Sequence, residues 1–279
     1  MTRECDDKPP MNPYISHDMN SLPGKIGRRA MGLLTAAVFA MLAAMPAQAE
    51  PHASDWAGDS KETQVRLVSA VSGTGDLEEL RLGLQFRMDP GWKIYWRSAG
   101  TTGYPPAVDW SQSDGLGEVE FLWPAPTRFK IFGIEAVGYK EEVVFPLNVA
   151  LTRPGEAVSL HAQVDYLTCK EICIPGNVLL ALDFPAGPAD ATPFAALIDM
   201  YRARVSVSAN KIGMSIEQGV FIPVEDGVSL RVAIKSDRPM VEPDLFVEGP
   251  PLVFFENPQV QLSRDGRYAV ITELGIGAT

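Results

Sequence analysis

The sequence predicts an all-β protein: an antiparallel β-sandwich, then a short helix and a second, smaller β domain. Two observations support this fold class. Apolar and polar residues alternate with a period of two in many short segments, which is typical of half-buried strands. Turn signals rich in Gly and Pro separate these segments, and no helical periodicity occurs between residues 50 and 184. Consecutive strands without intervening helices favour an antiparallel sandwich over a parallel sheet.

The clearest strand pattern covers residues 80–88, whose even-numbered positions are all Leu, Phe or Met. The stretch at residues 98–106 is too rich in Gly and Pro to form a regular element. Residues 124–137 mix Pro, Gly and aromatic side chains without a period, so we expect a long loop there. The other strands of the sandwich are expected at residues 64–71, 92–96, 107–110, 118–123, 143–151, 158–166 and 178–184.

The composition changes at a stretch rich in Pro and Gly that begins at Pro185. Thr192 can cap a helix that has Pro193 in its first turn. Residues 194, 197, 198 and 201 then have the apolar spacing of an amphipathic helix. Further strands are expected at residues 214–216, 228–234, 244–247, 259–262 and 268–274. We therefore divide the chain into an N-terminal extension with a signal peptide (1–49), the sandwich (50–186), a linker with the short helix (187–204), and a second β domain that is truncated or packs on the first (205–279).

Residues 1–49 have the organisation of a secretory signal peptide. Basic residues at positions 25, 28 and 29 precede an apolar run over residues 31–45, and residues 47–49 are Ala-Gln-Ala, an A-x-A cleavage site. A transmembrane anchor is the alternative, but the run is shorter than the roughly 20 residues that a membrane-spanning helix needs. We therefore expect cleavage of this segment and export to the periplasm.

Charge and cysteine content narrow the function. The chain after residue 49 has 19 basic and 31 acidic residues, a net charge of −12. This balance argues against nucleic acid as a partner, because nucleic-acid binding needs a basic face. Of the three cysteines, Cys5 lies in the segment that is removed, which leaves Cys169 and Cys173. In an oxidising compartment a disulfide between these two is expected.

Cys169 and Cys173 are separated by three residues and lie between two predicted strands, at the tip of a hairpin. A tight turn can bring their Cβ atoms within the roughly 3.5–4.5 Å that a disulfide requires. A loop this short gains little stability from closure entropy, so the bond is poorly suited to a structural role. It is better suited to exchange through a mixed disulfide. We therefore predict a pair that cycles between dithiol and disulfide without any other cofactor.

Two other functions are compatible with these residues. A non-catalytic binding module would carry a structural disulfide, with a reduction potential well below about −300 mV. A Cu(I) carrier could use the two thiolates, but no His follows Cys173, and His161 shares its strand face with Ser159 and Gln163, which indicates a solvated side chain. A structural zinc site would need four ligands, which are not apparent, so no metal site is predicted.

Large apolar residues in the loop expected at residues 124–137 need a packing partner. Phe129, Ile131 and Phe132 could pack over the disulfide and limit unwanted oxidation or reduction, or they could close one end of the sandwich. The first interpretation predicts that Phe132→Ala exposes the thiols to alkylation. Trp92 and Trp96 are most simply core residues.

Five motifs occur in an order that is similar to a known family. They are GWKIYW at 91–96, TGYPP at 102–106, KIFG at 130–133, YKEEVVFP at 139–146 and DYLTCKEICIP at 165–175. Together they resemble the amino-terminal periplasmic domain of the DsbD/ScsB-type transmembrane thiol–disulfide interchange proteins, over about residues 60–186.

This resemblance implies an immunoglobulin-like fold and protein-disulfide reductase activity, with links to cytochrome c biogenesis and copper tolerance. It implies that a membrane thiol electron transporter or a thioredoxin-like domain supplies electrons, and that periplasmic thioredoxin-fold proteins such as disulfide isomerases receive them. It also implies that Cys173 bonds to partners and Cys169 resolves the mixed disulfide. The cap loop then matches Lys130, Ile131, Phe132 and Gly133, with Tyr166 and Pro175 near the site.

Two departures from the family pattern affect these implications. The best-studied branch has a wider cysteine spacing, and it has acidic residues in the cap where this chain has Phe129 and Lys130. A nearby Lys favours the thiolate, so the thiol pKa is expected to differ. We expect either that this chain is a stand-alone or shortened version of the family, or that another protein supplies the membrane and thioredoxin-like modules.

Overall fold

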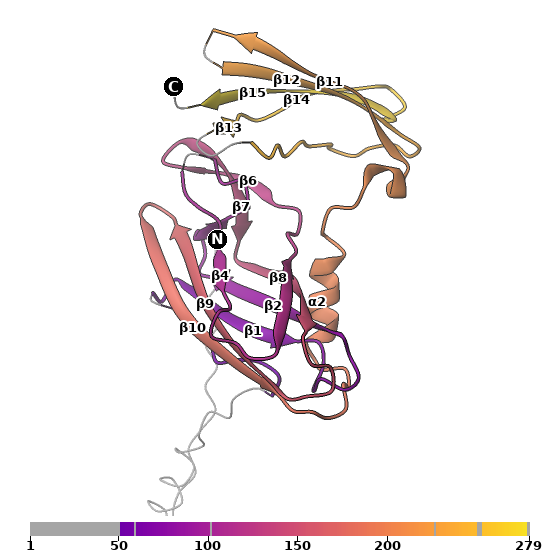
Figure 1. The fold of residues 1–279 in the computed structure, drawn as a ribbon. Coiled ribbons are helices and arrows are strands. Elements are labelled where there is room, and N and C mark those ends of the chain that lie inside the picture. The colour runs from indigo at the N-terminus through magenta and orange to yellow at the C-terminus, as the bar shows by residue number, and fades with distance from the viewer. Residues whose placement is uncertain (1–50, 59, 101, 226, 250–252, 278–279) are drawn as a thin grey trace, which may run out of the picture. The chain divides into compact units, whose positions relative to one another are not determined.

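The computed structural model describes residues 51–277, except residues 59, 101, 226 and 250–252. Over this part of the chain the fold consists of three antiparallel sheets and a single α-helix, which confirms the predicted all-β class (Figure 1). The predicted extension, Cys5 and the signal peptide lie outside the described residues.

The first two sheets form an immunoglobulin-like sandwich. The alternating strands pack their apolar sides into one core, in which Leu80, Leu82, Leu84 and Phe86 are fully buried. The first sheet has the order β1 (Thr63–Ser69), β2 (Glu79–Met88), β8 (Glu142–Leu151) and β5 (Leu116–Phe121). The second has the order β10 (Cys173–Phe184), β9 (Val158–Cys169), β3 (Lys93–Tyr95), β7 (Ile134–Lys140) and β6 (Thr127–Ile131), and β4 (Ala107–Asp109) also pairs with β9.

Strands β9 and β10 form a long hairpin, in which Val158 pairs with Phe184 at one end and Cys169 pairs with Cys173 at the other (Figure 1). The alternation along both strands explains this register, because side chains of directly paired residues share a face. Leu160 and its partner Leu182 are buried in the sandwich core. The predicted hairpin with the cysteines at its tip is therefore present.

The prediction of a loop at residues 124–137 was wrong, because β6 and β7 form a second hairpin there. Its turn consists of Phe132 and Gly133, with φ of 52° and 82°. Two positive φ angles in succession are typical of the two-residue turns that match the twist of hairpin strands. The sequence did not predict this hairpin for two reasons. Phe-Gly is not one of the common turn pairs, and the flanking Pro and Gly residues make the alternation of apolar and polar residues hard to recognise.

The predicted short helix is α2 (Ala195–Arg202). The Thr192 hydroxyl accepts a hydrogen bond from the Phe194 backbone N–H at 3.1 Å just before the helix, but the N-cap residue is Phe194 rather than the predicted Thr192. Ile198 and Tyr201 are buried against the sandwich, where α2 lies beside β2 and β8. Within the described residues, no helix is long and apolar enough to span a membrane.

After a short 3₁₀ segment (Ala209–Ile212), the C-terminal strands form the third sheet. Its order is β11 (Met214–Val224), β12 (Gly227–Ser236), β15 (Tyr268–Gly277) and β13 (Val253–Phe255), and β14 (Gln259–Leu262) also pairs with β15. We call residues 214–277 the C-terminal region. Its small core contains Leu230, Val232, Ile234, Ala269 and Ile271.

The prediction of a strand at residues 244–247 was wrong, because these residues are not in a strand. The next described strand along the chain is β13, at residues 253–255. Residues 244 and 245 instead bind a side chain of the sandwich: Arg128 on β6 contacts the Asp244 carboxylate and donates to the Leu245 carbonyl. The described residues belong to one compact unit, so these contacts are internal to it. The predicted domain boundaries at residues 186 and 205 stay a prediction.

Arg128 also forms an ion pair with a buried carboxylate of the third sheet. Its Nη2 atom lies 2.5 Å from Oε1 of Glu273, whose side chain is fully buried, and 3.1 Å from Oδ1 of Asp244. Burial raises the pKa of Glu273 from its usual value near 4.5 to about 7, although the neighbouring guanidinium opposes the rise. Burial therefore disfavours the charged form of Glu273 more than Arg128 favours it.

This raised pKa predicts a pH dependence of stability. A carboxyl group whose pKa is higher in the folded than in the unfolded protein stabilises the fold at low pH and loses that contribution as pH rises. From about pH 4.5 to pH 8, the wild type should therefore lose on the order of 2 kcal/mol of unfolding free energy relative to Glu273→Gln, which cannot ionise. Denaturant unfolding of both proteins at pH 5 and pH 8 measures this. A difference that is the same at both pH values would contradict it.

Candidate redox site

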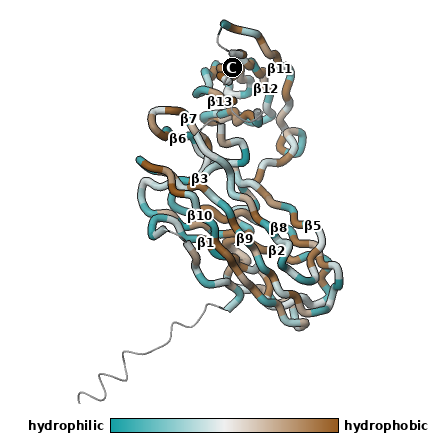
Figure 2. The backbone as a smooth tube through the Cα atoms, turned by 60° about the vertical axis from the view of Figure 1, so that its left-hand side comes forward, coloured by the Kyte–Doolittle hydropathy of each residue, from teal (hydrophilic) through white to brown (hydrophobic). Residues whose placement is uncertain are grey.

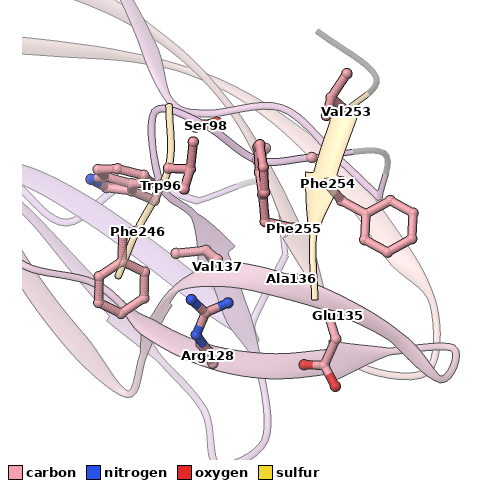
Figure 3. A pocket seen from close by; sticks show the side chains of 13 residues that line it. Trp96, Ser98, Arg128, Glu135, Ala136, Val137, Phe246, Val253, Phe254 and Phe255 are labelled. Atoms are coloured by element: carbon pink, nitrogen blue, oxygen red, sulfur yellow. The ribbon is translucent and has the colours of Figure 1, made fainter. Parts of the chain in front are cut away.

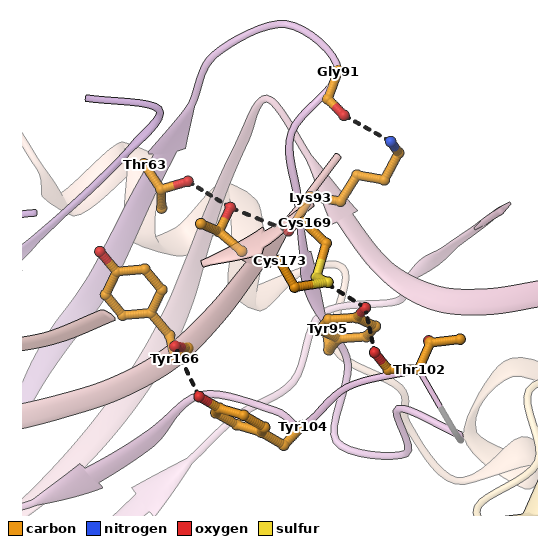
Figure 4. The surroundings of a disulfide bond; sticks show 10 residues. Thr63, Gly91, Lys93, Tyr95, Thr102, Tyr104, Tyr166, Cys169 and Cys173 are labelled. Atoms are coloured by element: carbon orange, nitrogen blue, oxygen red, sulfur yellow. Dashed lines mark hydrogen bonds between the residues drawn. A yellow bond between two sulfur atoms is a disulfide. The ribbon is translucent and has the colours of Figure 1, made fainter. Parts of the chain in front are cut away.

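A disulfide joins Cys169 and Cys173 at the end of the β9–β10 hairpin, where their Cα atoms are 4.1 Å apart (Figure 4). The two residues are direct cross-strand partners, and the turn between them is closed by a 2.9 Å hydrogen bond from the Lys170 N–H to the Ile172 carbonyl. The spacing of three residues is therefore the length that a tight turn needs to place the two cysteines opposite each other.

The disulfide lies on the outer face of its sheet. Successive side chains along β9 alternate between faces, so Tyr166 and Thr168 face the sandwich core while Leu167 and Cys169 face away from it. A second, small cluster covers Cys169 on this outer face. It contains Tyr95, Ala99, Phe129, Ile131, Ala136 and Cys169, with Leu167 and Cys173 packed against it.

The two sulfur-bearing residues differ in exposure. Cys169 is fully buried, whereas Cys173 is partly exposed. A molecule that approaches from solvent therefore reaches Cys173 first. The bond thus joins a partly exposed cysteine to a fully buried one.

Tyr95 is a site residue that the sequence did not reveal. Its hydroxyl donates to the Thr102 carbonyl at 2.9 Å and lies 3.2 Å from Sγ of Cys169 (Figure 4). Burial raises the pKa of Tyr95, so the hydroxyl stays protonated and can act as a donor to a thiolate. Gly103 packs on this ring so closely that a Cβ there would lie 2.3 Å from a ring carbon. The sequence does contain one signal for Tyr95: it is an aromatic residue on a strand face whose other residues, Lys93 and Arg97, are charged. A large apolar ring on such a face needs a packing partner outside the sandwich core.

The residues predicted for the cap lie on the β6–β7 hairpin, residues 127–140, which we call the cap hairpin. Ile131 is fully buried in the small cluster, whereas Phe132 at the tip is 65% exposed. Lys130 points outward and pairs with Glu135 at 3.0 Å. Gly133 occupies the turn. The side chains of the cap hairpin that pack with the disulfide are thus Phe129, Ile131 and Ala136.

The two residues predicted near the site have different surroundings. Tyr166 is buried in the sandwich core, with its ring 5.4 Å from that of Phe86, and its carbonyl accepts a hydrogen bond from Tyr104 (Figure 4). Pro175 is exposed and shares the strand face of Cys173. Across the described residues, no group of three or more His, Cys, Asp or Glu side chains could hold a metal ion.

A row of cationic side chains continues from the disulfide across the sheet. Lys140, Lys93, Cys169 and Cys173 are successive cross-strand partners on β7, β3, β9 and β10, so they share one face. Both lysine ammonium groups lie over the Phe129 ring, at 5.7 and 5.9 Å from its centroid. Burial, and next the charges of Lys140 and Lys170, lower the pKa of Lys93. Because Lys93 is the direct cross-strand neighbour of Cys169, its positive charge is expected to favour a thiolate in the reduced protein.

Comparison with known families matches two parts of the chain. Residues 62–185 match the family described as thiol:disulfide interchange protein DsbD, N-terminal. Residues 215–275 match a domain of unknown function, DUF8393. A search of the curated proteins finds no match.

Two solved structures are similar to this chain. The N-terminal periplasmic domain of ScsB from Proteus mirabilis is 23% identical, with a TM-score of 0.65, and the similarity covers 82% of this chain and 86% of that chain. The reduced DsbD N-terminal domain of Neisseria meningitidis is 18% identical, with a TM-score of 0.27, and covers 46% and 86%. The first similarity shows the same fold over most of the chain.

Because Ile131 is buried beside the disulfide and Phe132 is exposed, the two side chains should shield the thiols unequally. In the reduced protein, Ile131→Ala should raise the rate of thiol alkylation roughly threefold to tenfold, since it leaves a cavity over Cys169. Phe132→Ala should change this rate less. Iodoacetamide kinetics followed by mass spectrometry compare the two variants. A larger effect of Phe132→Ala would assign the shield to the tip instead.

The lysine row predicts a pH effect on thiol reactivity. Lys93→Met keeps most of the side-chain length and removes one cation beside the pair, so the pH midpoint of thiol alkylation should move to higher pH. The alkylation rate of the reduced protein between pH 5 and pH 10 gives this midpoint. Lys211→Met removes an equal charge from an exposed position in the 3₁₀ segment and serves as the control. Equal midpoints in wild type and Lys93→Met would show that the row does not act on the thiol.

Proposed function

Residues 62–185 belong to the DsbD N-terminal domain family, and from this premise we propose that the chain is a periplasmic protein-disulfide reductase that passes reducing equivalents through Cys169 and Cys173. The observation that carries this proposal is the unequal exposure of the two cysteines at the hairpin tip. An exchange reaction needs a cysteine that the partner can reach and a second cysteine close enough to resolve the mixed disulfide.

In the proposed reaction the reduced protein starts with two thiols. The Cys173 thiolate attacks one sulfur of a partner disulfide, which forms a mixed disulfide and releases the partner's other sulfur as a thiolate. Cys169 then loses its proton and attacks Sγ of Cys173, which restores the Cys169–Cys173 bond and releases the second partner thiol. Two electrons have moved to the partner, whose disulfide has become a dithiol.

The buried Tyr95 hydroxyl supports the second step. Cys169 must form a thiolate in an apolar cluster, where burial disfavours charge. At 3.2 Å from Sγ, the Tyr95 hydroxyl can turn from the Thr102 carbonyl to the sulfur and stabilise the developing charge. Lys93, the cross-strand partner of Cys169, acts in the same direction through its positive charge.

Exported thioredoxin-fold proteins, disulfide isomerases among them, are the proposed partners. Exposed apolar side chains at both hairpin tips support a protein partner, since Phe132 is 65% and Ile172 60% exposed. Figure 2 shows the tip of the cap hairpin in the colour of hydrophobic residues. To repeat the cycle, the Cys169–Cys173 disulfide must be reduced by a thiol donor, for which we propose a membrane thiol electron transporter or a thioredoxin-like domain.

The unequal roles predict an asymmetric trapping result. Reduced Cys169→Ala should form a one-to-one adduct with an oxidised thioredoxin-fold protein, because Cys173 can attack the partner disulfide but the Cys169 thiol that would resolve the mixed disulfide is absent. Non-reducing electrophoresis detects the adduct, dithiothreitol should abolish it, and mass spectrometry should locate the bond at Cys173.

Cys173→Ala is the matched control and should give at least about tenfold less adduct, because its remaining thiol is buried. Equal adduct from both variants would contradict the assigned roles. No adduct from Cys169→Ala would contradict the reductase function.

A further inference from the structure

The cap hairpin has two faces with different neighbours. Phe129, Ile131 and Ala136 belong to the cluster around the disulfide. Arg128 and Glu135 occupy alternate positions on the same strands, so they lie on the opposite face. Both of these side chains contact the C-terminal region, residues 214–277. The cap hairpin thus has the disulfide cluster on one side and the C-terminal region on the other.

On the first strand of the cap hairpin, Arg128 makes several contacts with the C-terminal region. Its guanidinium binds the carboxylates of Glu273 at 2.5 Å and Asp244 at 3.1 Å, and it donates to the Leu245 carbonyl. It also lies 5.0 Å from the centroid of the Phe246 ring, which is seen beside it in Figure 3. The Glu273 side chain is fully buried and that of Arg128 is 14% exposed. Removing one partner of such a desolvated pair is far more costly than breaking an exposed one.

The second strand of the cap hairpin is held as well. The Asn257 side-chain amide donates to the Glu135 carboxylate at 3.2 Å. Strand β13 lies against β7, and Phe255 lines a small cavity with Ala136 and Val137 (Figure 3). The C-terminal region therefore contacts both strands of the hairpin rather than one of them.

The same region contacts the loop that follows β3. The Phe246 ring lies 6.1 Å from that of Trp96, and the Gly249 N–H donates to the Ser98 hydroxyl at 3.4 Å. This loop leads to Thr102, whose carbonyl holds the Tyr95 hydroxyl next to Cys169. Two separate walls of the disulfide cluster are thus supported from the C-terminal region.

We propose that the C-terminal region is a brace that holds the cap hairpin closed over the Cys169–Cys173 pair, and that Arg128 is the positioning residue through which it acts. This inference rests on the proposed function, because it assigns the brace a role in the access of partners and oxidants to that pair. It also gives a role to the part of the chain that matches a domain of unknown function.

The brace has a direct physical consequence. The hairpin cannot lift from the cluster as a unit without separating Arg128 from Glu273. With Arg128 and Glu135 held by the C-terminal region, the part of the hairpin that can move is its tip around Phe132 and Gly133. Access to the disulfide is therefore set by contacts that lie far from the cysteines in the sequence.

The test removes the brace contact without altering the cluster. Arg128→Gln keeps the side-chain stem and removes the charge, and Arg128→Lys keeps the charge but loses the forked geometry. In the reduced protein, alkylation of the cysteines by iodoacetamide should be about tenfold faster in Arg128→Gln, with Arg128→Lys in between. Arg231→Gln, at an exposed position on β12 of the third sheet, which also contains Glu273, is the matched control and should behave as wild type.

Hydrogen exchange separates positioning from a loss of overall structure. Exchange in Arg128→Gln should be faster over residues 127–140 and unchanged over β12. Faster exchange over both segments would mean that Arg128 only stabilises the fold, which would overturn the proposal. An unchanged alkylation rate would overturn it equally.

A second variant keeps the test decisive if Arg128→Gln fails to fold. Asn257→Asp lies at an exposed position and places a negative charge against Glu135. It should raise the alkylation rate roughly twofold to threefold through like-charge repulsion at the second strand. No change in this variant would overturn the brace. Because alkylation and hydrogen exchange need no partner protein, they can fail or succeed independently of the Cys173 adduct that tests the reductase function.

Discussion

The pairing register of β9 and β10 is the constraint on which the site depends. Apolar partners such as Leu160 and Leu182 fill the sandwich core along this hairpin, and a slip by one residue would turn them to solvent. The same register sets Cys169 opposite Cys173 and opposite Lys93 on β3. The burial that fixes the core therefore also fixes the geometry of the disulfide, although the disulfide itself lies outside that core.

The two faces of this sheet carry separate apolar clusters. One cluster stabilises the sandwich, and the other controls access to the disulfide. The main cluster between the sheets is large and contains Phe86 and Tyr166. The small cluster around Cys169 receives Phe129 and Ile131 from the cap hairpin. Few buried contacts hold such a cluster, and regions of this kind open at a lower free energy than the core. The thiols can thus become accessible while the sandwich stays folded.

The local alternation of apolar and polar residues predicted the regular strands. It failed in segments whose conformation depends on contacts with residues distant in the sequence. Residues 80–88 and the β9–β10 hairpin alternate clearly, since each has one face in the core. The cap hairpin was missed, because its faces pack on a small cluster and on a distant region rather than on core and solvent. The strand expected at residues 244–247 is absent for a related reason, since Asp244 and its neighbours bind Arg128 instead of a strand.

The sequence by itself determined the all-β class, the short helix and the cysteine pair at a hairpin tip, because period-two alternation and turn signals are local properties. Its order of motifs also indicated the family whose model matches residues 62–185. Only the tertiary structure decided which sulfur is buried, that Ile131 rather than Phe132 packs beside the pair, and that the Tyr95 hydroxyl reaches Cys169. The sequence also did not reveal that Arg128 pairs with Glu273. The two residues are 145 positions apart, and only the packing of the third sheet brings them together. Such contacts depend on how elements pack in space, which no local pattern encodes.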